Sequence, residues 1–346
     1  MILREFIKVL GTNRREGRNL SCEEAETAFA RILEGEGSDV QVGAFLMAMR
    51  WKGETVDELV GFTRAARAMA KIPSTFLSDP VAIGSPHDGK RGSPPLNGPA
   101  GIVAAACGVP LLQVTDPAPP GSGRLTSADV LRALGAGWCD CPEHAEGQWN
   151  GLGYVALSAR ALLPGLDRLR LVRSELGVRV AVHTIEKLIL PRSATAVVGV
   201  HKGPNLGLAA EVLHQLGHQR GFVVQGVEGG TDPFVSQTTQ RVEIDGGKLL
   251  HSPIVPSDYG VDESEEPQLE VSDAPAAAKL AEALLEGREF GPARSAMLLC
   301  AAQLLVAGRR SASLAEGVDQ ARVAVDRGQA RAKLQELRRA FHSGSA

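Results

Sequence analysis

Apolar residues in the first seventy positions recur at the three- and four-residue spacing of amphipathic helices. Ser21, Ser38 and Thr55 each stand three residues before a Glu or a Gln. This spacing is typical of a capping box, in which the side chains satisfy the free backbone amides at the start of a helix. The pattern predicts three helices, at residues 22–34, 39–51 and 56–71. We interpret this region as a small helical domain.

After Pro80 the pattern changes, because short apolar runs now alternate with helical segments. Strands are predicted at residues 81–83, 109–114, 197–200 and 222–225. Helices are predicted at residues 98–107, 127–134, 208–216, 292–307 and 313–327, with a last charged helix reaching residue 341. A hairpin is predicted around Asp245-Gly246-Gly247. The alternation indicates an α/β domain with a mainly parallel sheet flanked by helices.

The composition is that of a soluble globular protein. Of the 346 residues, 44% are hydrophobic and 22% are charged. No apolar run is long enough to span a membrane, and Met1–Phe6 carries charge too early for a secretory signal. The five cysteines are an odd number without a framework spacing, so we expect a cytoplasmic protein with free thiols.

The net charge of −3 argues against a strongly basic nucleic-acid-binding domain. The charge is uneven, however. Residues 258–273 carry several acids and no Lys or Arg, which predicts a solvated acidic loop. Without that segment the rest of the chain is mildly basic, so an anionic ligand remains compatible with the composition.

The loop from Gly84 to Gly89 follows a predicted strand and precedes a helix. Such a glycine-rich loop can present backbone amides to a phosphate group. It reads Gly84-Ser85-Pro86-His87-Asp88-Gly89. An ordinary turn between a strand and a helix explains the same pattern, and both interpretations stay open at this point.

Several longer stretches of the sequence favour the interpretation that this loop binds a phosphate group. The segment from Leu20 to Thr55 resembles the N-terminal helical domain of the anthranilate phosphoribosyltransferase and pyrimidine nucleoside phosphorylase superfamily (glycosyltransferase family 3). Ser127–Gly135 is similar to the helix after that family's second active-site loop, and Ser313–Gly317 to its C-terminal helices. The likeness runs in order from about residue 20 to residue 338.

The resemblance implies a fold with two domains. Residues 1–75, together with about 158–190, would form a helical domain that also makes a homodimer. Residues 76–157 and 191–346 would form the α/β domain. It also implies a phosphoribosyl diphosphate site at the loops, with magnesium as a possible cofactor.

Four departures from the family pattern concern those loops. Pro86 and His87 replace residues of the family's Gly-Thr-Gly-Gly-Asp-Gly loop, which removes an amide donor and adds a side chain. The family's Lys-His-Gly-Asn-Arg loop corresponds to residues 115–119, where cations are lost and Asp116 appears, so a diphosphate would gain little there. Glu228 is kept as a weak magnesium candidate, but its neighbour is Gly229, although Asp232 lies nearby. His183 stands where the family has its substrate arginine.

Residues 124–127, 183–188 and 226–229 resemble a divergent branch of the family that includes nucleic-acid-binding members. The resemblance implies a cleft suited to a polyanion. The phosphate or polyanion candidates are Gly84, Ser85, His87, Asp88, Gly89, Lys90, Arg91, Arg124, His183, Lys187, Arg192 and Lys202, with His201 as a further cation. The arginines at 168, 170, 173 and 179 are interpreted as the polar face of a helix.

Two hypotheses follow. The first is a homodimeric protein that binds single-stranded DNA or RNA without phosphoribosyl transfer. The alternative is an active pentosyltransferase that takes a phosphorylated small molecule and an altered acceptor. A zinc site at Cys139-Asp140-Cys141-Pro142-Glu143-His144 is disfavoured, because the cysteine spacing is too tight and no second pair follows.

Overall fold

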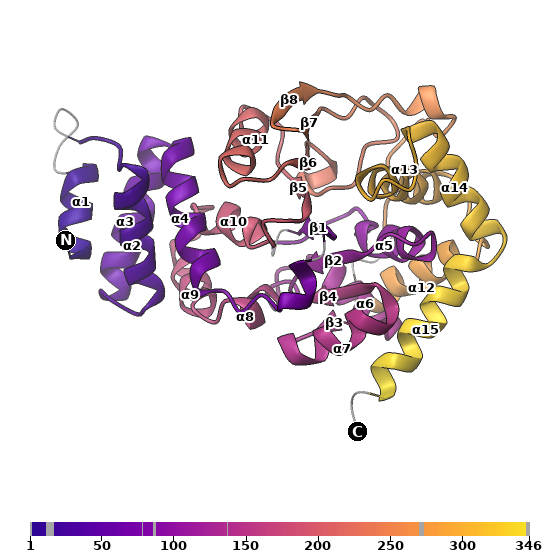
Figure 1. Ribbon diagram of the computed structural model, residues 1–346, viewed down its shortest axis with the longest axis horizontal. Coiled ribbons are helices and arrows are strands. Elements are labelled where there is room, and N and C mark those ends of the chain that lie inside the picture. Colours follow the sequence, from indigo (N-terminus) through magenta and orange to yellow (C-terminus); the bar gives the residue numbers. More distant parts are fainter. Residues whose placement is uncertain are drawn as a thin grey trace.

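The protein is described here from a computed structural model that covers residues 2–11, 17–77, 79–85, 88–136, 138–269 and 273–343. It confirms the predicted fold class: a small N-terminal helical domain stands beside a larger α/β domain with a mostly parallel sheet between helices (Figure 1). His87, one of the predicted phosphate-binding residues, lies outside the described residues.

The N-terminal bundle contains the three predicted helices and one more. Its helices are α1 (Leu3–Gly11), α2 (Cys22–Leu33), α3 (Asp39–Lys52) and α4 (Val56–Met69). All three predicted capping boxes form, with Ser21, Ser38 and Thr55 each accepting from the third helical amide. The ring of Phe62 packs against those of Phe29 and Phe45, at centroid distances of 5.3 and 5.9 Å, and these contacts hold α2, α3 and α4 together.

The sheet has eight strands in the order β3-β4-β2-β1-β5-β6-β7-β8. They are β1 (Val81–Gly84), β2 (Leu111–Val114), β3 (Trp138–Cys139), β4 (Tyr154–Leu157), β5 (Thr195–Gly199), β6 (Arg220–Val224), β7 (Arg241–Asp245) and β8 (Lys248–His251). The first six are parallel to one another, and β7 and β8 add the predicted antiparallel hairpin at one end. The loops after β1, β2, β5 and β6 therefore leave the same edge of the sheet.

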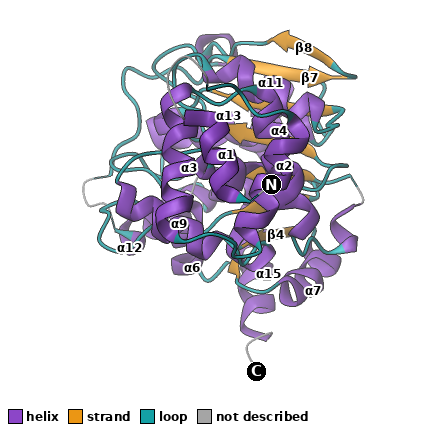
Figure 2. Ribbon diagram, turned by 90° about the vertical axis from the view of Figure 1, so that its left-hand side faces the viewer, coloured by secondary structure: helices purple, strands orange, loops and turns teal. Residues whose placement is uncertain are grey.

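Helices cover both faces of the sheet, and Figure 1 shows the sheet edge-on between them. One face carries α5 (Asn97–Ala106), α6 (Ser127–Leu134), α12 (Ala274–Leu285), α13 (Pro292–Ala307), α14 (Leu314–Asp326) and α15 (Gln329–Ser343). The other carries α11 (Asn205–Gln215), α10 (Val182–Ile185), α9 (Leu166–Leu176), α8 (Ala159–Leu162) and the bundle. Figure 2 looks at the bundle from outside, with α1 and α3 nearest the viewer.

Three regions differ from the sequence predictions. Residues after Cys141 form a helix that was not predicted, α7 (Pro142–Leu152), and the Cys141 thiol caps its start. Strands β3 and β4 were not predicted. The acidic segment is not a purely solvated loop, because Glu266 accepts from the Val235 and Ser236 amides.

No described helix combines the length and apolarity needed to cross a membrane. No group of three or more His, Cys, Asp and Glu side chains in the described part of the chain is placed to hold a metal ion.

Candidate functional site at the carboxyl edge of the sheet

The loops at the carboxyl ends of the parallel strands face the helices of residues 158–190. In an open α/β sheet this edge is where ligands bind, because loops from neighbouring strands meet there. The first loop, after β1, and the second loop, after β2, are joined by backbone hydrogen bonds in both directions between Lys90 and Leu125. The site is thus built from two linked loops on one side and from α9 and the turn after it on the other.

A cavity of about 920 Å³ lies between these two walls. Six arginines and two aspartates are the charged residues among those that line it. The lining consists of Asp88, Pro117, Ala118, Pro119, Pro120, Ser122, Arg124, Arg132, Arg160, Asp167, Arg170, Leu171, Arg173, Ser174, Gly177, Val178 and Arg179. Guanidinium groups outnumber carboxylates in this lining, which favours an anionic ligand.

Asp88, a predicted phosphate-loop residue, is held by three side chains from the opposite wall. Arg173 forms a close ion pair with its Oδ1, Arg179 Nε lies 3.2 Å from its Oδ2, and His183 Nδ1 lies 3.3 Å from the same oxygen. This contact connects the loop after β1 to the helical segment. An anion that enters the cavity would share Arg173 and Arg179 with Asp88.

The sequence suggested that Asp116 would repel a phosphorylated ligand, but the structure corrects this. Arg170 donates to Asp116 Oδ2 at 2.8 Å, the Ser158 hydroxyl donates to Oδ1 at 2.5 Å, and Arg160 Nε lies 3.7 Å away. Asp116 is buried, and its charge is neutralised. The cations missing from the second loop are supplied instead by helices α8 and α9.

The carboxylate of Glu228, the magnesium candidate, already accepts hydrogen bonds from within the protein. Its carboxylate accepts from the backbone amides of Arg91, Gly92 and Ser93 at 2.9, 3.4 and 3.3 Å. Its own backbone adopts the left-handed conformation (φ 52°), which is uncommon for a residue with a side chain. Its carboxylate therefore braces the segment that follows the first loop.

The remaining positions near Glu228 also lack a carboxylate for a metal. A Cβ atom at Gly229 would come within 2.7 Å of the His201 ring, so a second acid does not fit there. Asp232 forms a buried ion pair with Lys90. The residues present do not fit a magnesium ion held by the protein alone, which would need oxygen ligands that are free to coordinate it.

Several residues that were predicted to bind phosphate contact other residues of the protein instead. Lys90 is buried against Asp232. The Ser85 hydroxyl accepts from Asn97 and Gln113, both at 3.3 Å, and its amide continues the pairing with β2. Lys187 is buried and donates to the Gly199 carbonyl at 2.8 Å. The side chains of these three residues are therefore buried in internal contacts.

The histidines of the site are neutral near pH 7. Burial lowers the pKa of His183 well below its usual value, and the charges of Lys187, Arg173 and Arg179 add to this effect. Burial also lowers the pKa of His201 to about 4, again with Arg179 contributing. With these lowered pKa values, the positive charge of the cavity is assigned to its arginines.

The other predicted cations are dispersed. Arg124 lines the cavity, and it donates to the Gly89 carbonyl at 3.1 Å. Lys202 lies at the same edge of the sheet but is held over the Phe234 ring and against Gln237. Arg192 precedes β5 and packs beside Gly217, which precedes β6, so it lies at the opposite edge and does not join the site.

Five arginines of the cavity were not predicted as site residues from the sequence. Arg132, Arg160, Arg170, Arg173 and Arg179 line the cavity, although three of them had been interpreted as the polar face of a helix. Only Arg168 fits the earlier interpretation, because it joins Asp39 and the Gly37 carbonyl of the bundle. Their order along the chain gave no sign that the helix would face the loops. A clue was available in the spacing of Arg170 and Arg173, which puts both on one side of a helix.

Gly84 has a packing role that the sequence did not reveal. A Cβ atom there would lie 2.0 Å from the Lys187 carbonyl oxygen, so the end of β1 rests directly on the backbone of the 186–188 turn. We expect Gly84→Ala to destabilise the protein by about 1–3 kcal/mol, because one of the two backbones has to move. Urea unfolding measures this change.

Gly147→Ala is the matched control for Gly84→Ala, since it lies inside α7 with nothing within 4 Å of the added carbon. It should leave stability unchanged or raise it by up to about 1 kcal/mol, because alanine favours a helix. Equal stability of the two variants would contradict the close contact at Gly84.

Comparison with known proteins agrees with this architecture. The helical bundle domain of a glycosyl transferase family matches residues 10–70, and the a/b domain of a glycosyl transferase family matches residues 97–331. The anthranilate phosphoribosyltransferase of Methylobacterium radiotolerans is 38% identical over 336 residues, which cover 95% of this chain and 94% of that protein. That of Solibacter usitatus is 34% identical and covers 93% and 95% of the two chains.

Solved structures give the same result. The anthranilate phosphoribosyltransferase of Thermus thermophilus superposes with a TM-score of 0.82 at 31% identity, covering 97% of this chain and 99% of that one. The enzyme of Saccharomyces cerevisiae, solved in complex with PRPP and Mg, has a TM-score of 0.79 at 19% identity and supports the fold alone. The chain belongs to glycosyltransferase family 3, the family of the anthranilate phosphoribosyltransferases.

Proposed function

We propose that this protein is a pentosyltransferase of its family that binds a phosphorylated donor in the arginine-lined cavity and uses an acceptor other than anthranilate. The observation that carries the proposal is the cavity itself, where six arginines outnumber two aspartates between the first two loops and α9. Relatives that are 34–38% identical along nearly the whole chain are anthranilate phosphoribosyltransferases, which supports the same class of reaction.

These arginines would bind the phosphorylated donor and stabilise the charge of its departing phosphates. When a pentosyl group leaves a diphosphate for an acceptor, negative charge grows on the departing phosphates. Arginines placed beforehand around that position stabilise the charge without having to reorganise. Arg124 and Arg179 lie on the two opposite walls, so they are suited to hold such a group between the loops and the helical segment.

The proposed change of acceptor rests on His183. This residue corresponds to the family's substrate arginine in the resemblance described above, and it is buried, neutral and turned toward Asp88. A neutral imidazole gives an anthranilate carboxylate much less than a guanidinium would. An acceptor without a carboxylate at that position fits the site better.

The direct test incubates the protein with phosphoribosyl diphosphate and a panel of aromatic amines and nucleobases, with and without Mg²⁺, and measures released diphosphate. The proposal expects release that depends on one acceptor of the panel and little release with anthranilate. Because the carboxylates of Glu228 and Asp232 are engaged in internal contacts, we expect Mg²⁺ to act only together with the diphosphate. If tight donor binding is accompanied by no turnover with any acceptor, the proposed activity is wrong.

A second candidate function is the binding of single-stranded nucleic acid without transfer. It is favoured by one observation, namely that Glu228 and Asp232 are both engaged in internal contacts and leave no metal site. Nucleic-acid binding would be independent of Mg²⁺ and would weaken steeply with salt, since each neutralised phosphate releases counterions. A labelled oligonucleotide followed by fluorescence anisotropy at several salt concentrations separates this function from small-donor binding.

We further propose that residues 1–75, with about 158–190, form a dimerising domain. Helix α3 supports this, because Val40, Ala44, Met47 and Trp51 recur at helical spacing on its outer side. Val40 is 82% exposed and Trp51 is 90% exposed. An apolar stripe of this kind on an outer helix suits the same stripe of a second copy.

We expect Trp51→Glu to convert a dimer to a monomer, because a buried carboxylate would lack a partner at the interface. Light scattering after size exclusion gives the mass directly. Val323→Glu is the matched control, since Val323 is an exposed apolar residue on α14, and it should leave the mass unchanged. A wild-type protein that is monomeric at micromolar concentration would contradict the proposal.

A further inference from the structure

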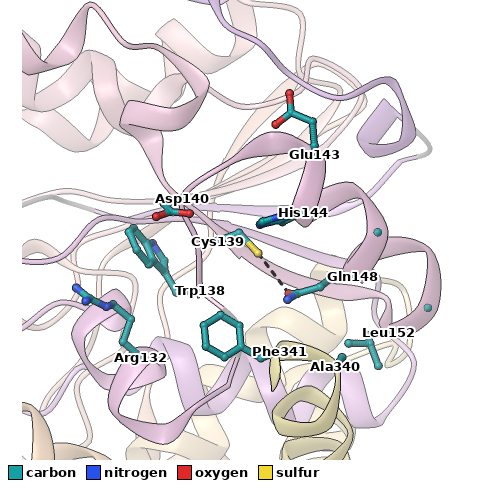
Figure 3. A pocket seen from close by; sticks show the side chains of 12 residues that line it. Arg132, Trp138, Cys139, Asp140, Glu143, His144, Gln148, Leu152, Ala340 and Phe341 are labelled. Carbon is teal, nitrogen blue, oxygen red and sulfur yellow. Dashed lines mark hydrogen bonds between the residues drawn. The ribbon is translucent and has the colours of Figure 1, made fainter. Parts of the chain in front are cut away.

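A second cavity of about 910 Å³ lies beside the arginine-lined one, at the β3 edge of the sheet. It is enclosed by β3, α7 and the last turn of α15 (Figure 3). Trp138 and Phe341 supply aromatic rings to its wall, and Leu152 adds an aliphatic side chain. None of these residues belongs to the site described above.

One residue belongs to both cavities. Arg132, in the last turn of α6, lines the arginine-lined cavity and also the second one. Its guanidinium lies over the Trp138 ring, 5.3 Å from the ring centroid. Trp138 is fixed in turn by the hydrogen bond from its indole N–H to the Thr115 carbonyl, at 2.8 Å, and Thr115 begins the second loop. The two cavities are thus adjacent, with Arg132 between them and Trp138 fixed in the wall of the second.

The charges of the two cavities differ in a way that would orient a ligand. The first has an excess of arginines, whereas the lining of the second contains Asp140 and Glu143 and a single arginine, Arg132. A phosphate group is favoured in the first cavity and disfavoured in the second. A planar ring with N–H groups suits the second, where it finds aromatic surface, a guanidinium plane and carboxylate acceptors.

We propose that the second cavity holds the planar aromatic ring of a nucleotide-like ligand whose phosphate lies among the arginines of the first. The proposal rests on the anion site of the proposed function and adds the chemical class of the ligand. Trp138 is the residue that would contact the ring. Free nucleotides and the nucleotides of a single strand share this chemistry, so the test includes both.

The test compares ribose 5-phosphate with adenosine 5′-monophosphate by calorimetry, since the two carry the same phosphate and differ by the base. We expect the nucleotide to bind wild-type protein about 10-fold more tightly than ribose 5-phosphate. This is the gain in affinity expected when one base stacks on an aromatic side chain. Trp138→Leu should remove this advantage and leave ribose 5-phosphate binding unchanged. Trp138→Phe should keep most of it. Phe290→Leu changes an exposed aromatic residue that lines neither cavity and should have no effect.

Three results would overturn the inference in distinguishable ways. Equal affinity of the two probes for the wild type, or an advantage of the nucleotide that survives in Trp138→Leu, would remove the ring site while leaving the anion site intact. No binding of either probe would remove the anion site as well. A labelled ten-nucleotide DNA strand should show the same dependence on Trp138, and its affinity relative to the mononucleotide tells which source of nucleotide the protein prefers.

Discussion

Lys90→Met should destabilise the protein by about 3–5 kcal/mol, the usual cost of leaving one partner of a buried ion pair alone. Lys90 is 6% exposed and Asp232 is 2% exposed, and the two carry opposite charges in direct contact. With Lys90 removed, the Asp232 carboxylate would remain buried without its cation. Chemical denaturation in urea measures the loss.

Two further variants separate this effect from a general sensitivity to mutation. Lys90→Met combined with Asp232→Leu removes both charges at similar volume and should recover most of the stability, because no buried charge is left over. Arg322→Met removes the cation of the exposed pair with Asp319 on α14 and should cost less than about 1 kcal/mol. A loss below 1 kcal/mol for Lys90→Met itself would show that Lys90 faces solvent or ligand, as the sequence had suggested.

The second large effect concerns the two arginines on opposite walls of the cavity. Replacing Arg124 and Arg179 together by alanine should weaken the binding of a phosphorylated ligand by about 100-fold or more, because each removes a charge-assisted hydrogen bond of about 1.5–3 kcal/mol. Calorimetric titration with phosphoribosyl diphosphate gives the dissociation constants of the wild type and of the double variant.

The control for this pair removes the same amount of positive charge elsewhere. Arg168→Ala with Arg322→Ala leaves the cavity intact, since Arg168 joins α9 to the bundle and Arg322 lies on α14. Its affinity should stay within about 3-fold of the wild type, because surface charges beyond a Debye length are screened. An equal loss in both double variants would mean that net charge, rather than the cavity, determines binding.

Much of the fold was predictable because it is encoded locally. The capping boxes at Ser21, Ser38 and Thr55 set helix starts that the structure reproduces. The short apolar runs at β1, β2, β5 and β6 marked the buried parallel strands. Strand β3 escaped prediction because it has only two residues, and α7 because it begins at a Cys-Pro step whose cap is a thiol rather than a common capping side chain.

The site was harder to predict because its charges are paired across long stretches of sequence. Lys90 and Asp232 are separated by 142 positions, and Arg173 meets Asp88 across 85. Nothing in the neighbourhood of Lys90 in the sequence indicates that an acid will neutralise it. Conversely, the second loop lacks cations of its own but lies opposite α9, which provides them. The loops alone therefore suggested a weaker anion site than the folded cavity provides.

We propose above all that the arginine-lined cavity binds a phosphorylated anion. This is measured most directly by a calorimetric titration of the wild-type protein with phosphoribosyl diphosphate at low and at physiological salt, in EDTA and in Mg²⁺. We predict saturable binding to one site per chain that persists in EDTA and weakens as salt rises. No detectable binding at low salt, with or without Mg²⁺, would contradict it.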